Sequence, residues 1–478
     1  MTCPAGSMRS DLGREGLMQL TIAEAAAALR SGETTSVELV RSAFAVADAH
    51  DTELGVYLSR FDDTALAAAA QADAELAEGL DRGPLHGIPL GIKDSIATEE
   101  GETTAQSVVL DRTWGSTGDA PVVARLRAAG AVVTGKTAMM EFAIGAPDAD
   151  QPFPITRNPW NTAHYSGGSS SGAGCGVSTG MFLGGLGTDT AGSIRFPAAA
   201  CGVTGLKPTF GLVPKSGCVP LGYSYDHIGP LARTAQDCAT ILNAVSGHDA
   251  SDPTSVDSAR FTVPDSITGL RIGVDPLLDE SPHAHSELGS LFELAVHELQ
   301  AAGASVVPVE LPCYAELKSV TRLGLAAEAY AYHRNDLQDR WSDYGAGTRM
   351  AVVRGALISA GDFVQLQRVR RVGQRKLADL FGDVDLVVTP TMTGPAPELR
   401  SLRTDGMADA ALTACWNAVG NPAMSVPMGF TSDGLPLGMH IAGKPFDDAA
   451  VIAAGQAYQR RTDWHRRVPE LVRDHFTA

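Results

Sequence analysis

The sequence lacks several features that would place it in a specialised class of protein. Its seven cysteines are scattered over 478 residues and form no C-x-x-C pair, which indicates reduced small hydrophobic residues, not a disulfide framework or a zinc site. Lys and Arg number 37 against 55 Asp and Glu, and the net charge of −18 argues against a nucleic-acid or anionic-membrane partner. No apolar run approaches the length that spans a bilayer. We therefore expect a soluble cytoplasmic protein.

The sequence has ample material for a large buried core, with 44% apolar residues and 51 glycines. Residues 1–18 look like a flexible extension. Two capping boxes follow, because Thr21 precedes Glu24 by three residues and Thr35 precedes Glu38 in the same way. They predict one helix that ends at Ser31-Gly32 and a second that runs through Val46. A third, Ala-rich helix is expected from residue 62 to about 79.

Short apolar, β-branched segments alternate with these helical patterns along the rest of the chain. This alternation is typical of an α/β fold. The segment from about 311 to 381 is helical in pattern and more charged, and it resembles a lid more than part of a sheet. The predicted strands cover residues 87–93, 131–134, 270–274, 305–309, 385–390, 423–427 and 437–443.

A segment built almost wholly from Gly, Ser, Ala and Thr stands at the centre of the chain, in residues 165–175, 186–197 and 201–208. Such small residues allow backbone to approach backbone or ligand closely. Proline fits only the first turn of a helix, so Pro197 predicts a helix that begins near Ile194. Ser193 would then lie at the helix amino end, where unpaired N–H groups favour a developing negative charge. This is a candidate position for a serine nucleophile.

Two other segments match known catalytic or binding motifs, but the residues around them do not fit the structures that these motifs require. Residues 130–137 match the P-loop pattern, but Ala131–Thr134 is apolar and β-branched and is expected to pair in a sheet instead of cradling phosphate. Residues 168–172 match the nucleophile elbow of α/β-hydrolases, which requires a preceding buried strand. Residues 157–165 form a polar turn pattern instead. Neither nucleotide binding nor a Ser-His-Asp esterase is favoured.

A third interpretation combines Ser193 with Ser169 and Lys93. A serine hydroxyl needs a base to remove its proton, and a lysine is a base only where burial or neighbouring groups keep it neutral. The apolar run Ile88–Ile92 offers such surroundings. From the residues alone, a lysine that ends a strand is equally often a solvated charge, and Ser/Gly runs are often plain turns. Both interpretations remain open at this level.

The chain resembles the amidase signature family from about Leu20 to Arg467. The resemblance rests on many segments in the family's order, not on one motif. These segments are Gly87-Ile-Pro-Leu-Gly-Ile-Lys-Asp94, Asp119–Leu126, Gly135-Lys-Thr137, Glu141-Phe-Ala143, Thr156–Trp160, the small-residue segment above, Asp226-His-Ile-Gly-Pro230, Thr389-Pro390, Gly420–Pro427 and Thr462–Arg466.

The resemblance implies a single large α/β domain over residues 19–478, with a mixed, twisted sheet between α-helices. Its catalytic core would comprise about 85–245 and 383–445, under a helical cover from about 311 to 381. It also implies that Ser193 is the nucleophile, that Ser169 bridges it to Lys93 after a cis peptide bond, and that Lys93 is the base. The N–H groups of a short turn would form the oxyanion hole, namely those of Thr190, Ala191, Gly192 and Ser193. Neither a metal nor another cofactor is expected.

Four further residues are candidate supports of this site: Gly168, Ser170, Asp189 and Arg195. Asp189 and Arg195 flank the nucleophile and are expected to orient its turn. Ser170 is expected to cap or pack the next helix in preference to joining the hydrogen-bond network. The candidate substrate pocket is adaptable and apolar, which suggests an apolar or aryl-bearing substrate. It comprises Met139, Met140, Leu221, Tyr223 and Tyr225.

The expected function is hydrolysis of a C–N amide bond through an acyl-enzyme, extending to aryl esters or carbamates. The substrate would be a small molecule, and the chain would act as a monomer or a homodimer. Two alternatives stay open. One is a glutamine-hydrolysing subunit of a tRNA-dependent amidotransferase, which needs partner subunits. The other is a catalytically silent relative that acts as a binding protein.

Overall fold

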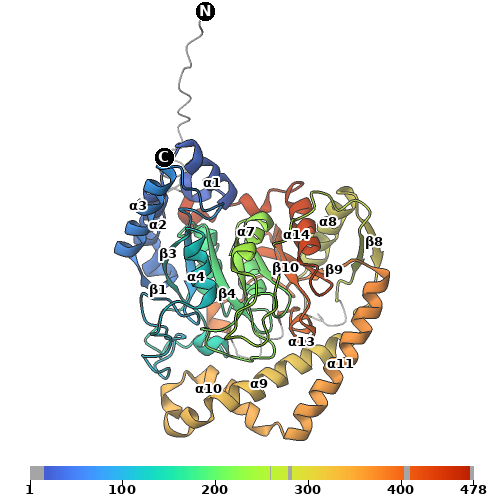
Figure 1. The fold of residues 1–478 in the computed structure, drawn as a ribbon. Helices are drawn as coiled ribbons and strands as arrows, with labels where there is room; N and C mark the ends of the chain where they lie inside the picture. Colours follow the sequence, from blue (N-terminus) through green and yellow to red (C-terminus); the bar gives the residue numbers. More distant parts are fainter. Residues whose placement is uncertain (1–15, 259, 278–282, 403–409, 474–478) are drawn as a thin grey trace, which may run out of the picture.

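A mixed eleven-stranded sheet forms the centre of the computed structural model, which describes residues 16–258, 260–277, 283–402 and 410–473 (Figure 1). The strand order is β1-β3-β2-β4-β6-β5-β10-β11-β9-β7-β8. Strands β3, β2 and β4 are parallel neighbours, as are β9, β7 and β8, while the strands between these two groups pair antiparallel. The strands are β1 (Tyr57–Arg60), β2 (Pro89–Lys93), β3 (Val132–Thr137), β4 (Gly184–Asp189), β5 (Thr204–Lys207), β6 (His227–Ala232), β7 (Arg271–Val274), β8 (Ser305–Pro308), β9 (Leu386–Pro390), β10 (Ala423–Phe430) and β11 (Pro436–Gly443).

Helices cover both faces of this sheet. Side chains alternate across a strand, and on β10 Met424 and Val426 pack into the cluster of helices α7 and α14. Helix α6 contacts the same strand from the other face, where the buried helix α5 lies beside it. The helices around the sheet are α1 (Ile22–Ser31), α2 (Ser36–Leu54), α3 (Asp62–Ala77), α4 (Pro121–Ala128), α5 (Ser171–Thr179), α6 (Arg195–Cys201), α7 (Ala235–Val245), α8 (Leu288–Ala301), α13 (Cys415–Val419), α14 (Asp448–Gln459) and α15 (Glu470–Arg473).

A group of helices lies at one end of the sheet, at the bottom of Figure 1, and we call it the helical cover. It packs on the core through α13 and through a second buried apolar cluster that is separate from the main core. The predicted helical segment from 311 to 381 is therefore helical in the structure. The cover comprises α9 (Tyr314–Asp339), α10 (Ala346–Val353) and α11 (Ala360–Asp383), with short 3-10 turns at η3 (Trp341–Asp343) and η4 (Arg354–Leu357).

The predicted amino-terminal helices are confirmed, with two differences. Both capping boxes are present, with the threonine and glutamate of each box bonded reciprocally to the backbone. Helix α2 continues to Leu54, eight residues beyond the predicted end, because its buried face continues to Leu54 and the left-handed residue that ends it is Gly55. The predicted flexible extension lies outside the described residues up to position 15. Its last residues differ from the prediction, since Leu17 and Met18 are buried in the short helix η1 (Gly16–Gln19).

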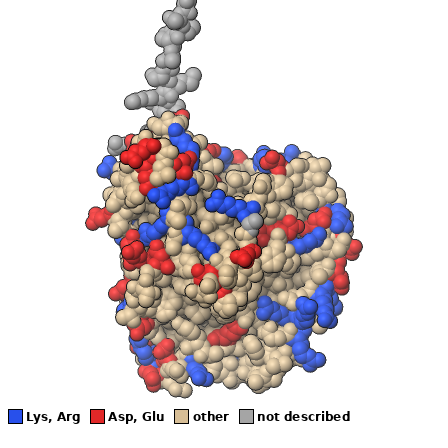
Figure 2. Space-filling model, in the orientation of Figure 1, with Lys and Arg blue, Asp and Glu red and all other residues tan. Residues whose placement is uncertain are grey.

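Acidic and basic side chains are both spread over the visible surface, and one of the groups of basic side chains lies near α11 (Figure 2). Among the described residues, no helix is both long and apolar enough to cross a membrane. The sheet between two helical layers and the single continuous architecture confirm the predicted α/β class with one large domain.

Candidate active site

Lys93 ends strand β2 and is wholly buried. Its Nζ lies within hydrogen-bond distance of the hydroxyls of Ser169 at 2.7 Å, Ser170 at 3.0 Å and Thr188 at 2.7 Å. All three partners are neutral, so they solvate the amine without balancing a positive charge. Burial accordingly lowers the pKa of Lys93 from 10.5 to about 7. The alternative of a solvated lysine at a strand end is excluded.

Ser169 and Ser170 directly precede helix α5. The Gly168–Ser169 peptide bond is cis, as the resemblance implied. Ser170 differs from its prediction, because its hydroxyl makes no capping bond to α5. That hydroxyl instead contacts Lys93 and bonds both to the N–H and to the carbonyl of Thr188 on β4. Ser170 therefore belongs to the hydrogen-bond network around the lysine.

The turn that carries Ser193 follows β4 and is fixed by the carboxylate of Asp189. This carboxylate accepts from the N–H groups of Gly192 at 2.8 Å and Ile194 at 3.1 Å. It is also paired with the buried guanidinium of Arg195 at 2.8 Å. Burial opposes ionisation of Asp189, but the adjacent Arg195 outweighs burial, and the pKa of this carboxyl lies below its ordinary value. Asp189 and Arg195 thus shape the turn from beneath it.

Residues from distant parts of the chain complete this buried network. Asn417 on α13 donates to Asp189 at 2.9 Å and accepts from Arg195 at 2.6 Å. Arg195 also donates to the Thr413 carbonyl at 3.0 Å and lies 3.0 Å from Nε2 of His440. Asn417, Thr413 and His440 could not be predicted as partners of this turn, since each is more than 200 positions from Asp189 and none belongs to a short motif.

The backbone N–H groups around Ser193 are not equivalent. Gly192 was a candidate oxyanion donor, but its N–H already donates to Asp189. Thr190, Ala191 and Ser193 remain the candidates for that role. Helix α6 begins at Arg195 with Ile194 as its cap, one residue later than predicted, so Ser193 lies just before the helix amino end. The Ser193 carbonyl accepts from the N–H of Ser170 at 3.1 Å, which joins the two serine segments.

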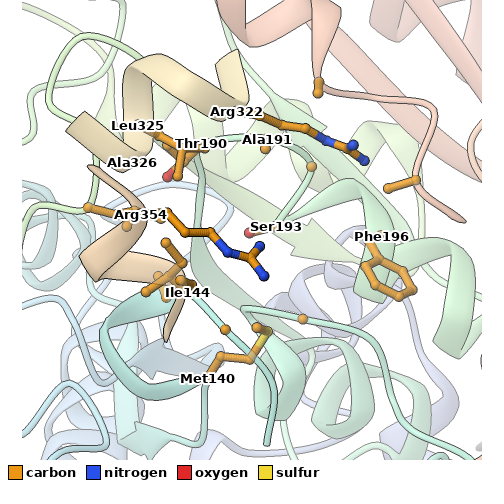
Figure 3. A pocket seen from close by; sticks show the side chains of 18 residues that line it. Met140, Ile144, Thr190, Ala191, Ser193, Phe196, Arg322, Leu325, Ala326 and Arg354 are labelled. Atoms are coloured by element: carbon orange, nitrogen blue, oxygen red, sulfur yellow. The ribbon is translucent and has the colours of Figure 1, made fainter. Parts of the chain in front are cut away.

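A cavity of about 470 Å³ opens in front of Ser193 (Figure 3). Its size is within the range of pockets for small organic ligands. Met140 and Leu221 line it, as predicted. Met139 and Tyr225 do not line it, and both are buried in the apolar cluster beneath the cover. The rest of the lining comprises Ala143, Ile144, Gly145, Gly168, Thr190, Ala191, Gly192, Ser193, Phe196, Arg322, Leu325, Ala326, Ala351, Arg354, Ala411 and Ala414.

Tyr223, the remaining predicted pocket residue, lies in another place. It lines a smaller cavity of about 200 Å³ on the other side of Thr190, and its hydroxyl donates to Asp252 at 3.0 Å. Its ring is also stacked against the ammonium group of Lys215. These contacts explain the difference, because a tyrosine held by a cation and a carboxylate is not available to the larger cavity.

The segment that matches the P-loop pattern is a strand, as expected from its β-branched residues. It forms β3, and Lys136 within it is buried. The Nζ of Lys136 donates to the Ile96 carbonyl and to the Thr103 hydroxyl, and it lies 3.6 Å from the Asp94 carboxylate. This lysine therefore holds neighbouring backbone segments together.

The arrangement can activate a serine. A buried amine with a lowered pKa contacts the hydroxyls of Ser169 and Ser170, and Ser193, just before a helix amino end, faces a cavity with backbone N–H groups around it. The Amidase family model matches residues 38–452 of the chain. The chain belongs to the Amidase family. It is therefore an enzyme that hydrolyses carbon–nitrogen bonds.

Individual Amidase family proteins are similar over almost their full lengths. A glutamyl-tRNA(Gln) amidotransferase subunit from Chloroflexus aggregans is 38% identical, over 96% of this chain and 99% of that protein. The peptide amidase structure from Stenotrophomonas maltophilia has a TM-score of 0.82 at 31% identity, covering 94% of this chain and 98% of that one. A third similar structure is a chain of a vestigial protein complex, reported to reveal the evolutionary origins of an s-triazine catabolic enzyme. It has a TM-score of 0.85 at 31% identity, covering 92% of this chain and 98% of that one.

Proposed function

We propose that the chain is a serine amidohydrolase that works through an acyl-enzyme with Ser193 as nucleophile. The observation that carries the proposal is the buried Lys93 amine, which contacts Ser169 and has no charged group among its three hydrogen-bond partners. An amine with a pKa of about 7 is substantially neutral at physiological pH and can accept a proton. A lysine with its ordinary pKa could not.

The proposed reaction has two halves. Ser193 Oγ attacks the amide carbonyl while its proton passes to Ser169, whose own proton passes to Lys93 Nζ. The negative oxygen of the tetrahedral intermediate receives hydrogen bonds from the N–H groups of Thr190, Ala191 and Ser193. The C–N bond then breaks, and the relay returns the proton to the departing amine. In the second half, water attacks the acyl-enzyme by the same relay, and the free acid and Ser193 are released.

Small amides are the proposed substrates, and aryl amides, aryl esters and carbamates are included because they pass through similar tetrahedral intermediates. The apolar lining from Met140, Ile144, Phe196, Leu221 and Leu325 supports an apolar portion in the substrate. We propose that the chain acts as a monomer or a homodimer.

The second candidate function is the glutamine-hydrolysing subunit of a tRNA-dependent amidotransferase. The 38% identity to such a subunit over nearly the full length favours keeping it. Assays of the purified chain on an aryl anilide and on glutamine separate the two functions. Anilide hydrolysis by the chain alone, lost in Ser193→Ala, supports the amidohydrolase. Activity on glutamine that appears only with partner subunits would replace it, and no activity with any amide would indicate a binding protein.

A further inference from the structure

The cavity in front of Ser193 has an unusual lining, because two of its residues are arginines. Of the described residues that line it, Arg322 and Arg354 are the charged ones, and the others are apolar side chains, glycines, one threonine and one serine. The chain as a whole carries 55 acidic and 37 basic residues. A cationic cavity is therefore not a consequence of a generally basic surface.

Both arginines come from the helical cover. Arg322 lies in α9 and is half-buried, while Arg354 begins η4 and is exposed. In Figure 3 their side chains extend from the cover across the cavity, whereas Ser193 lies on the turn from the sheet. Groups that the cover contributes to the cavity are placed to contact parts of a substrate other than the bond that breaks. Interactions with such a remote part contribute binding energy that can be used in the transition state.

The chemistry of the guanidinium group selects the ligand. It is planar, permanently charged and presents paired N–H donors that match the two oxygens of a carboxylate. Arg322 and Arg354 each make further contacts within the protein. The five N–H donors of each guanidinium allow a ligand to bind in addition to those contacts. These two cationic groups lie beside the apolar side chains Leu325, Ala326 and Ala351, so the cavity offers both an apolar surface and a binding position for an anion.

We propose that the substrate is an amide with an apolar body and a carboxylate, and that Arg322 and Arg354 bind this carboxylate. The inference rests on the proposed amidohydrolase function. The carboxylate binds at the cover end of the cavity, and the amide carbonyl lies at Ser193. The cover thereby determines which amides are cleaved.

Matched substrate pairs test this proposal in the wild-type chain. Succinyl para-nitroanilide is compared with butyryl para-nitroanilide, which places the carboxylate on the acyl side. N-acetyl para-aminobenzoate is compared with N-acetyl para-toluidine, which places it on the amine side. We expect kcat/KM to favour the anionic member of one pair by about 10-fold or more, the size of a charge-assisted hydrogen bond. Added salt should reduce this preference. Equal or better hydrolysis of both neutral members would overturn the inference and leave the amidohydrolase function intact.

Variants assign the preference to the two side chains. The ratio of kcat/KM for the anionic substrate to kcat/KM for its neutral partner should fall towards one in Arg322→Gln, in Arg354→Gln and in the double variant. Arg354→Lys should retain part of the preference. Arg368→Gln is the matched control, because this exposed arginine lies on α11 and does not line the cavity. An unchanged preference in the double variant would contradict the assignment.

Binding measurements keep the inference testable even without turnover. Calorimetric titration of Ser193→Ala with succinyl para-nitroanilide and butyryl para-nitroanilide, and with the two acetyl compounds, should show tighter binding of an anionic member. This preference should weaken in the double arginine variant. Selective anion binding by a chain that cleaves no amide would contradict the proposed function alone. Equal affinities within both pairs would contradict the carboxylate site.

Discussion

At the scale of single residues, the environment of Lys93 decides whether it can act as a base. The side chain is surrounded by three hydroxyls, of which only Ser169 was predicted from the sequence to contact it. Thr188 lies within the small-residue segment, but nothing in that segment's pattern indicates which of its hydroxyls contacts the lysine. The apolar residues before Lys93 are compatible with its burial but do not decide it, because a lysine at a strand end is equally often solvated. The fold buries this side chain, and the lowered pKa follows from that burial.

We predict graded losses of activity for the three proposed catalytic residues. Ser193→Ala should abolish turnover, because no acyl-enzyme can form. Lys93→Ala should lower kcat/KM by about 10²–10⁴-fold, the usual contribution of a positioned base. Ser169→Ala should leave measurable residual activity, since water can replace its hydroxyl. Steady-state kinetics on an anilide provide the measurement, and a fully active Lys93→Ala would eliminate the proton relay.

The pH dependence of the reaction follows from the same lysine. The active form is the neutral amine, so protonation below its pKa of about 7 removes the base. We expect kcat/KM to rise as pH increases through about 7 and to level off above it. Initial rates in buffers of constant ionic strength give the profile. A profile that is flat between pH 5 and pH 9, roughly two units on each side of that pKa, would show that Lys93 is not the base.

At the scale of elements, the sheet positions the site through close contacts that need glycine. Strand β4 was not predicted, because glycine is a poor strand former. The structure shows why glycines are there. A Cβ added at Gly187 would lie 2.7 Å from Ser170 Oγ and 2.8 Å from Leu231. The glycines that made β4 hard to predict from the sequence are therefore the residues that allow the serine segment to pack closely against this strand.

Helix α13 supports the Ser193 turn through Asn417, and this leads to a prediction. Asn417→Ala removes a partner of both Asp189 and Arg195, and it leaves buried charged groups with fewer hydrogen bonds. We expect the free energy of unfolding to fall by about 1–3 kcal/mol. We also expect a larger change in kcat than in KM. The substitution displaces the Ser193 turn, whereas the part of the cavity formed by the helical cover is unchanged. Urea unfolding and steady-state kinetics measure the two effects.

Asn243→Ala provides the matched control for that change. Asn243 lies on α7 and bonds the backbone of Phe261, away from the Ser193 turn. The Asn243→Ala variant should have a lower free energy of unfolding, but its kcat should stay close to that of the wild-type chain. Equal effects of both variants on kcat at matched stability would show that Asn417 acts only on the fold.

At the scale of the whole molecule, much of the architecture could be predicted and the pocket could not. The alternation of helical and strand patterns indicated the α/β class, and the charged segment from 311 to 381 indicated a cover. Two pocket residues, Met140 and Leu221, were identified correctly. Arg322 and Arg354 were not, because they lie in helices without a motif, and only the folded chain brings them to the cavity of Ser193.

We predict that the purified chain hydrolyses an aryl anilide without partner proteins and in the presence of a chelator. The proposed proton relay uses only groups of this chain, and among the described residues no cluster of three or more His, Cys, Asp or Glu is placed to hold a metal ion. Rates with and without EDTA should agree. Loss of activity on chelation that is restored by a divalent ion would contradict the proposed mechanism.

The two walls of the cavity come from separate parts of the chain. The turn with Ser193 belongs to the sheet, whereas Arg322, Leu325 and Arg354 belong to the cover. Because these walls have no catalytic atom in common, mutation can change one without the other. A library confined to α9 and η4 should therefore yield enzymes that accept new amides and retain the parent's pH profile, which gives selection and protein engineering a direct route to altered substrate range.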